Sequence, residues 1–99
     1  MKETELIEIL IELRSAARFD PIQAMKKYDM LFLGSKMNTI SVIELSHCLN
    51  KVFNINFPIA GLLKMIPTVC PGLGMKLIPL RKINNPDLNA VDDYLIELW

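Results

Sequence analysis

The stretch from residue 41 to residue 67 restricts the fold of this chain more than any other, because it contains the signals that start and stop two consecutive helices. Ser41 is followed three residues later by Glu44, a capping-box spacing in which each side chain satisfies a backbone amide of the first helical turn. This pattern predicts a helix from Val42 to Phe53. Its apolar residues recur at helical spacing and predict a buried face at Val42, Leu45, Leu49, Val52 and Phe53.

The residues after this helix predict a turn and a second helix of unusual composition. Asn54 to Asn56 are typical of a turn, and Pro58 suits the start of a helix that Pro67 stops or kinks. Between the two prolines, Lys64 is the one charged residue. We therefore expect an apolar helical segment directly after a tight turn.

The N-terminal region predicts an amphipathic helix from Thr4 to Ala17. Its expected core face consists of Leu6, Leu10, Leu13 and Ala17. Ile7, Ile9 and Ile11 widen the apolar side beyond what one core face needs. This width leaves two interpretations open, a helix wedged between two neighbours or a helix shared with a second copy of the chain.

Asp20 and Pro21 together form a further helix-start signal, since an aspartate caps a helix and a proline fits its first turn. The helix is expected to run from Pro21 to about Phe32 and to end at Gly34. Its expected inward residues are Ile22, Met25 and either Met30 or Leu33.

Two short strands are expected, from Lys36 to Ile40 and from Met75 to Ile83, and Pro79 assigns the second strand to an edge of the sheet. Asn85 and Pro86 predict the start of a last helix. Its expected core stripe is Leu88, Val91, Leu95 and Leu98. The sequence thus predicts a mostly helical α+β domain with four to five helices and two short strands.

The composition limits the classes of function. A chain of 99 residues is long enough for a single domain, residues 1–99, with one core. Eleven basic residues balance eleven acidic ones, so no global field attracts nucleic acid or an anionic membrane. The N-terminus lacks the features of a signal peptide, and no window reaches the ~18 apolar residues that a membrane span needs. We therefore expect a soluble, cytoplasmic protein without a membrane partner.

The order helix, strand, capped helix, tight turn, second helix and strand resembles a winged helix-turn-helix domain over about residues 36–83. The resemblance rests on the helix start at Ser41 and Glu44, the spacing of Leu45, Leu49 and Val52, the turn at 54–56, Gly61-Leu62-Leu63 and the strand from Met75 to Ile83. Members of this family mostly bind DNA by placing the second helix of the motif in the major groove. The resemblance therefore implies a winged-helix-like fold and DNA binding.

The second helix of the motif departs from this family where base edges would be read. A reading helix needs arginine, asparagine, glutamine, serine or lysine near its start, whereas residues 58–63 are proline, isoleucine, alanine, glycine and two leucines. Sequence-specific readout through this helix is therefore not expected. The cations that remain available for phosphate contact are Lys26, Lys27, Lys64, Lys76, Arg81 and Lys82.

The sequence also resembles acyl carrier proteins in the order of its turn and helix signals. The matching stretches are 19–21, 31–34, 44–45 and 53–58. Carriers hold phosphopantetheine on the serine of an Asp-Ser-Leu triplet, and the triplet at the corresponding spacing is Asn38-Thr39-Ile40. A degenerate carrier-like domain without the carrier chemistry is therefore a third interpretation.

Neither catalysis nor metal binding is predicted. His47 and Cys48 are adjacent on a helix, so their side chains diverge by about 100° and cannot form a nucleophile–base pair. Two cysteines and one histidine fall short of a four-ligand zinc site, and Cys48 and Cys70 are expected to be buried thiols. The segment 72–74 lacks the helix and lysine of a phosphate loop. We expect no cofactor, no metal and no small-molecule partner.

The favoured interpretation is a non-enzymatic interaction module that binds another protein or a second copy of itself. Because residues 58–67 are apolar where a winged helix usually contacts nucleic acid, we expect this segment to form the interface. The expected interaction surface comprises Ile59, Leu62, Leu63, Met65 and Ile66, with Ile7, Ile9 or Ile11 from the first helix. DNA binding through the cations on and near the second strand is the alternative.

Overall fold

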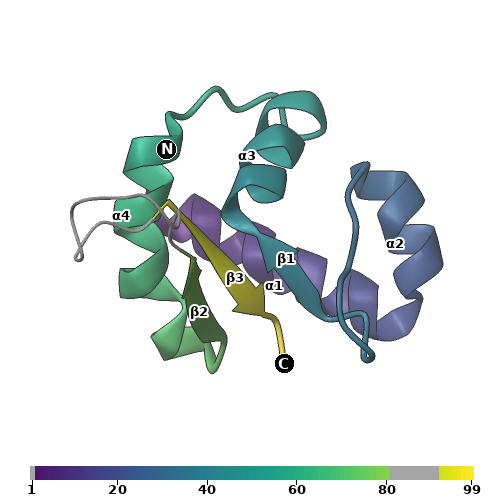
Figure 1. Cartoon of the computed structure of the whole chain (residues 1–99). Helices are drawn as coiled ribbons and strands as arrows, with labels where there is room; N and C mark the ends of the chain where they lie inside the picture. The colour runs from purple at the N-terminus through teal and green to yellow at the C-terminus, as the bar shows by residue number, and fades with distance from the viewer. Residues whose placement is uncertain (1, 81–91) are drawn as a thin grey trace.

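The computed structural model describes residues 2–80 and 92–99, which form an α+β domain that is mostly helical, as predicted. In chain order its elements are α1 (Glu3–Phe19), α2 (Pro21–Tyr28), β1 (Thr39–Ser41), α3 (Val42–Lys51), α4 (Ile59–Val69), the 3-10 helix η1 (Pro71–Leu73), β2 (Lys76–Leu80) and β3 (Asp93–Glu97) (Figure 1). Of the helices in the described residues, none combines the length and apolar character of a membrane span.

The strands form an antiparallel sheet in the order β1-β3-β2, so the last strand in the chain lies between the other two (Figure 1). Ile40 of β1 and Leu77 of β2 both lie opposite Ile96 of β3. β2 is an edge strand of this sheet, as Pro79 predicted, because a proline cannot donate a hydrogen bond to an outer neighbour.

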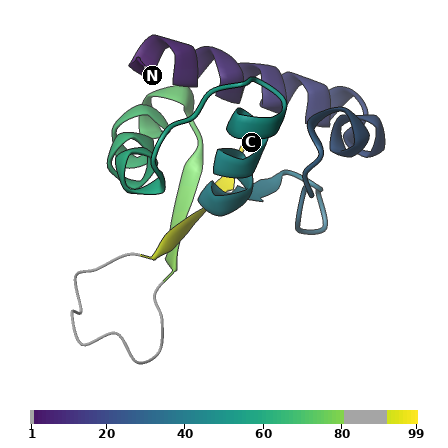
Figure 2. The ribbon, with the colours of Figure 1, turned by 90° about the horizontal axis from the view of Figure 1, so that it is seen from above.

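The core lies between the sheet and the helices. α1 extends across the molecule, with α4 near its start and α2 at its end (Figure 2). The predicted core face of α1 is confirmed, since Leu6, Leu10, Leu13 and Ala17 are all buried. Fully buried side chains of the sheet, α3 and α4 complete this core at Ile40, Ile96, Leu45, Leu62 and Ile66. One continuous apolar cluster therefore joins the elements.

α2 begins where the sequence predicts and ends earlier. The Asp20 carboxylate accepts a hydrogen bond from the Gln23 amide, and Pro21 is the first helical residue. The helix ends at Tyr28 because Asp29 adopts a left-handed conformation with φ of 51°. The predicted end near Phe32 is therefore wrong.

Residues 30–33 form an extended segment in place of the last turn of α2. Met30 and Phe32 are buried, whereas Leu31 and Leu33 are exposed. This two-residue period is that of an extended chain, in which successive side chains point to opposite sides.

Tertiary packing explains the remaining errors about α2. The Tyr28 hydroxyl donates a hydrogen bond to Glu12 of α1 at 3.0 Å and fixes which face of α2 is buried. Ile22, expected to face inward, lies outside that face and is exposed. Gly34, expected to end the helix, lies in the turn before β1 with φ of 84°.

The start of α3 is tied to two other parts of the molecule. Ser41 Oγ accepts a hydrogen bond from the Glu44 amide at 3.1 Å, as the capping pattern predicts. The Glu44 carboxylate instead accepts one from the Leu31 amide at 3.3 Å. Asp93 of β3 accepts another from the Val42 amide at 2.9 Å. α3 is thus anchored both to the 30–33 segment and to the sheet.

α3 ends at Lys51, short of the predicted Phe53. Val52 is exposed and not part of the buried face, whereas Phe53 is half-buried and stacks on Tyr28 with 5.9 Å between ring centroids. Asn54 has a φ of 57°, which reverses the chain direction at the predicted turn.

α4 continues through Pro67, which therefore does not stop the helix. Beyond the proline, the Cys70 amide donates to the Ile66 carbonyl at 3.0 Å, so helical hydrogen bonding resumes. At the start of the helix, the Phe57 ring lies against Gly61, where a Cβ would come within 2.7 Å of it. This glycine lets the aromatic ring pack closely on the first turn of α4.

The end of the chain contains a strand where the sequence predicts a helix. The expected helix positions Asn85, Pro86, Leu88 and Val91 lie outside the described residues. Leu95 lies in β3 and the buried Leu98 follows it, so the prediction that they share a helical stripe is wrong. The buried side chains Ile96 and Leu98 alternate at the spacing of a strand, which the pairing with β1 and β2 explains.

Candidate functional site

The interaction surface predicted on α4 is partly buried. Leu62 and Ile66 are fully buried, so the prediction that they belong to an exposed surface is wrong. Their four-residue spacing places both on the helix face that packs into the core. Leu63 and Met65 are half-buried against the same core. Ile59, the first residue of α4, is 42% exposed.

The isoleucines predicted on α1 contribute little exposed surface. Ile9 is buried, and Ile7 is half-buried against the core. Ile11 is exposed, but it lies on a different helix from Ile59. The exposed remainder of the predicted surface is therefore divided between two elements.

The predicted cations are also distributed over several elements. Those that the structure describes are exposed, with Lys26 and Lys27 on α2, Lys64 on α4 and Lys76 on β2. Arg81 and Lys82 lie outside the described residues. On the described elements, the cations thus supply at most two neighbouring charges from one helix.

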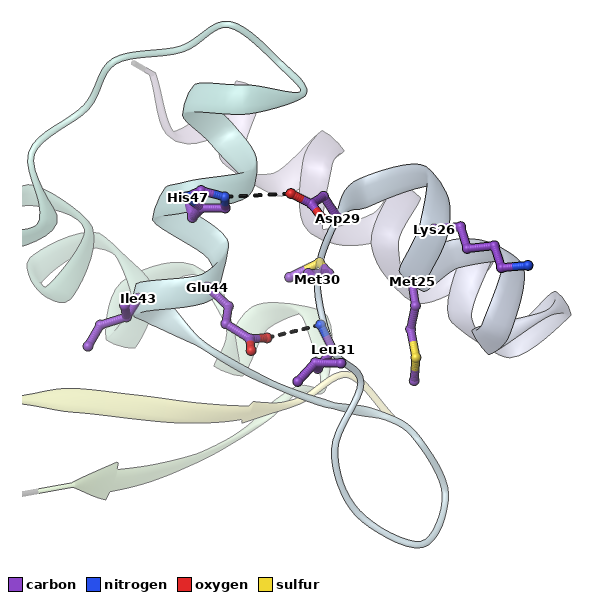
Figure 3. Close-up of a pocket in the computed structure, with 8 residues that line it drawn as sticks. All are labelled: Met25, Lys26, Asp29, Met30, Leu31, Ile43, Glu44 and His47. Atoms are coloured by element: carbon purple, nitrogen blue, oxygen red, sulfur yellow. Dashed lines mark hydrogen bonds and ion pairs between the residues drawn. The ribbon is translucent and has the colours of Figure 1, made fainter.

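A groove of about 600 Å³ lies between α2, the 30–33 segment and the first turns of α3. We call it the α2–α3 groove. It is lined by Met25, Lys26, Asp29, Met30, Leu31, Ile43, Glu44 and His47 (Figure 3). Two stretches of the chain, residues 25–31 and residues 43–47, therefore build its walls.

The lining of the α2–α3 groove includes two exposed aliphatic side chains. Leu31 is 56% exposed and Ile43 is 53% exposed, although both have aliphatic side chains. Met25 is half-buried beside them, and the buried Met30 lies deeper. Figure 3 shows Ile43 and Met25 on the two sides of the groove, with Leu31 between the walls. An apolar partner group would therefore remove substantial apolar surface from water here.

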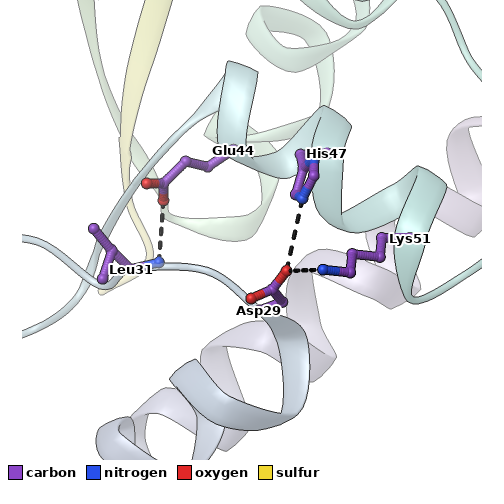
Figure 4. A network of polar contacts seen from close by, with 5 residues as sticks. All are labelled: Asp29, Leu31, Glu44, His47 and Lys51. Carbon is purple, nitrogen blue, oxygen red and sulfur yellow. Dashed lines mark hydrogen bonds and ion pairs between the residues drawn. The ribbon is translucent and has the colours of Figure 1, made fainter.

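Polar contacts hold the two walls of the α2–α3 groove together. Asp29 Oδ2 lies 2.6 Å from Lys51 Nζ and 3.7 Å from His47 Nε2, and both partners come from α3 (Figure 4). The hydrogen bond and charge of Lys51, assisted by His47, lower the pKa of Asp29 below its ordinary value. With the hydrogen bond from Leu31 to Glu44, this network fixes the end of α2 against α3.

A second groove, of about 330 Å³, lies on the other side of α3. We call it the α3–α4 groove. It is lined by Ile43, Ser46, His47, Asn50, Ile55, Asn56, Phe57 and Ile59. Because Ile43 and His47 line both grooves, one continuous surface runs across α3 from Leu31 to Ile59. We call this continuous area the α3 surface.

Sequence reasoning identified Ile59 on the α3 surface and missed Leu31 and Ile43. Ile43 lies off the buried helix face of Val42 and Leu45, and this spacing is a signal that a large aliphatic side chain is exposed. Helical spacing could not predict that Leu31 is exposed, because its exposure depends on the early end of α2 at Tyr28.

The reactive side chains near the α3 surface do not converge. His47 is exposed whereas Cys48 is buried, so the two diverge as their adjacency predicts. Cys48 and Cys70 are buried free thiols, as predicted, and burial raises their pKa values to about 11 and about 12. In the described part of the chain, no group of histidine, cysteine and carboxylate side chains is arranged to hold a metal ion.

Comparisons with family models, with curated proteins and with solved structures found no match to the chain.

Proposed function

We propose that this chain is a non-enzymatic interaction domain that binds a protein partner on the α3 surface. The observation that carries the proposal is the α2–α3 groove of about 600 Å³, with Leu31 and Ile43 more than half exposed inside it. Single exposed aliphatic residues are ordinary, but here two of them line one concavity.

The distribution of polar groups around this groove supports the same function. Protein interfaces typically have an apolar centre surrounded by a polar rim. Leu31 and Ile43 supply exposed apolar side chains to the groove, and Asp29, Glu44 and His47 supply polar ones beside them. Because the carboxylates already bond to Lys51 or to the Leu31 amide, the rim is held in place before a partner arrives.

We further propose that the domain is winged-helix-like. The order of elements on which that resemblance rests is present, with β1, α3, the turn at 54–56, α4 and β2 following one another. In this arrangement α4 occupies the position of a DNA-reading helix. All of its residues are described, and its one charged side chain is Lys64. Its accessible first residues, Ile59 and Ala60, offer no donor to a base edge, which favours protein docking.

DNA binding is the second candidate, favoured by the exposure of Lys64 on α4 and Lys76 on β2. Phosphate contacts dominate binding to random duplex DNA at low salt, so that is where the test belongs. This candidate predicts salt-dependent binding of a fluorescent duplex that weakens when Lys64 is replaced with glutamate. No binding at low salt excludes it.

The carrier-like interpretation gains no support. Asn38, Thr39 and Ile40 match the attachment triplet by spacing, and all three are buried. The Thr39 hydroxyl donates to the Asn38 side chain at 3.1 Å. A prosthetic group would therefore have no accessible oxygen at this position.

Photo-crosslinking in cells that naturally produce the protein tests the docking function. A photoreactive phenylalanine analogue replaces Ile43 in the groove, and in a matched control it replaces Glu8, which is exposed on α1. We expect protein adducts from position 43 that disappear when Leu31→Asp is added, and none from position 8. Absence of adducts from position 43, or adducts unaffected by Leu31→Asp, would contradict the proposal.

A further inference from the structure

We propose that the α2–α3 groove receives a second copy of this chain, docked through an apolar stripe along α2, and this inference rests on the docking function proposed above. The stripe consists of Phe19, the last residue of α1, and of Ile22 and Met25 on α2, and we call it the α2 stripe. The contact is reciprocal, so that the stripe of each copy lies at the groove of the other.

Two side chains of the α2 stripe are exposed to an unusual degree. Phe19, the last residue of α1, is 93% exposed, and Ile22, in the first turn of α2, is 58% exposed. A docked aromatic side chain removes ~150–250 Å² from water. Phe19 thus presents a large apolar surface that the described part of its own chain leaves uncovered, which is the property of an interface anchor.

Helical periodicity places the part of the stripe that lies within α2 and the groove on one face of the molecule. Residues three, four and seven positions apart share a helix face, so Ile22 lies on the side of α2 that carries Met25, Lys26 and Asp29. These three residues line the α2–α3 groove (Figure 3). The opposite side of α2 packs on α1. A two-fold axis across α2 therefore exchanges stripe and groove between two copies.

Charge favours an antiparallel crossing of the two α2 helices. The exposed Asp20 caps the start of α2, and the exposed Lys26, which lines the groove, lies in its last turn. An antiparallel crossing brings these opposite charges together, whereas a parallel crossing brings like charges together. Phe19 precedes the start of α2 and the groove lies at its end, so the antiparallel crossing also delivers each Phe19 to the groove of the partner.

The size of this surface indicates a weak dimer. Stable interfaces bury about 800 Å² on each partner, and Phe19 supplies only ~150–250 Å² of such an area. The stripe and groove together form a compact contact centred on one aromatic anchor. We therefore expect dissociation constants on the order of micromolar or weaker.

Sedimentation equilibrium of the purified full chain, from about 1 µM to about 1 mM, tests this inference. We expect a monomer–dimer equilibrium whose dissociation constant rises at least about tenfold in Phe19→Ser and in Ile22→Ser. Both side chains are exposed, so the variants should fold, and circular dichroism and thermal unfolding verify this. Ile78→Ser is the matched control, because Ile78 is an exposed aliphatic residue on β2, outside the stripe.

A monomer throughout the series, or a dimer equally insensitive to Phe19→Ser and Ile78→Ser, would overturn the inference. Lys26→Glu should weaken the dimer while Lys64→Glu should not, and equal effects would overturn the antiparallel crossing. Failure here is distinguishable from failure of the docking function. A monomeric chain that still forms Leu31-dependent adducts at position 43 in cells has the proposed groove with a different protein in it.

Discussion

At the scale of single residues, Asp93 joins the sheet to the start of α3. Its Oδ1 accepts hydrogen bonds from the Val42 amide at 2.9 Å and from the Tyr94 amide at 2.7 Å. Asp93→Ala leaves the buried Val42 amide without its acceptor, so we expect the free energy of unfolding to fall by about 1–3 kcal/mol. Asp93→Asn keeps an oxygen acceptor and should lose less. Urea unfolding followed by circular dichroism measures both, and equal losses would contradict this role.

Asp29 provides a prediction about ionisation. Lys51 and His47 lower the pKa of Asp29 below its ordinary value of 3.8. The network therefore stabilises the folded state fully at pH values above 3.8, and this stabilisation is lost as the pH falls through the lowered pKa. Lys51→Met should therefore raise the pKa of Asp29 toward 3.8. Side-chain NMR titration measures it, with Lys64→Met as the control that leaves it unchanged. An Asp29 pKa that does not respond to Lys51→Met would contradict the ion pair.

The capping residues that the sequence predicted correctly bond to amides only a few positions away in the chain. Ser41 and Asp20 cap helices whose first turns follow directly, so local spacing identified both. Asp93 caps α3 from 51 positions away, and nothing in its immediate sequence indicates this role. The capping box also predicted that the Glu44 carboxylate accepts from an amide of its own helix start. This part is wrong because the carboxylate accepts from the Leu31 amide, which lies in another segment of the chain.

At the scale of elements, Pro67 inside α4 yields a stability prediction. A proline within a helix removes one backbone hydrogen bond and crowds the preceding turn. Since the side chain is exposed, Pro67→Ala removes that cost without opening a cavity. We expect the free energy of unfolding to rise by about 1–3 kcal/mol, measured by thermal unfolding. Thr68→Ala, at the next exposed position, is the control, and a less stable Pro67→Ala protein would refute this expectation.

The elements also show where periodicity alone is ambiguous. α1 was predictable because its apolar residues repeat over many turns. Leu95 and Leu98, three residues apart, are compatible with a helix, and only pairing with β1 and β2 assigns a strand. Residues 30–33 are also compatible with either a helix or an extended segment. The left-handed conformation of Asp29 ends α2 before them and leaves them extended.

At the scale of the whole molecule, three buried acids predict how stability depends on alkaline pH. Burial raises the pKa of Cys48 from 9.0 to about 11, of Cys70 from 9.0 to about 12, and of Tyr28 from 10.0 to about 12. Each group favours the folded state only while protonated, so stability is complete below the unfolded pKa values and declines as pH rises through the folded ones.

Urea unfolding across this range measures the decline. We expect the free energy of unfolding to fall steadily above pH 9, and Tyr28→Phe to flatten the part of the curve above pH 10. A flat profile up to pH 12 in the unmodified protein would be inconsistent with burial of these groups.

The candidate site is a property of the assembled molecule, which limited its prediction from sequence. The apolar segment 58–67 was visible in the sequence, but Leu62 and Ile66 of this segment are buried in the core. The α3 surface draws on α2, the 30–33 segment, α3 and the start of α4. Only the fold brings these segments together. The sequence therefore predicted Ile59, at the edge of the α3 surface, and did not predict the residues at its centre.

Amide chemical-shift changes in a dilution series of isotope-labelled protein test whether the α2–α3 groove receives the α2 stripe of a second copy, because they locate the interface residue by residue. We expect concentration-dependent shifts at Phe19, Ile22, Leu31 and Ile43, with α4 beyond Ile59 unchanged. Shifts centred on Lys64 and Thr68, or none at concentrations where sedimentation detects a dimer, would contradict it.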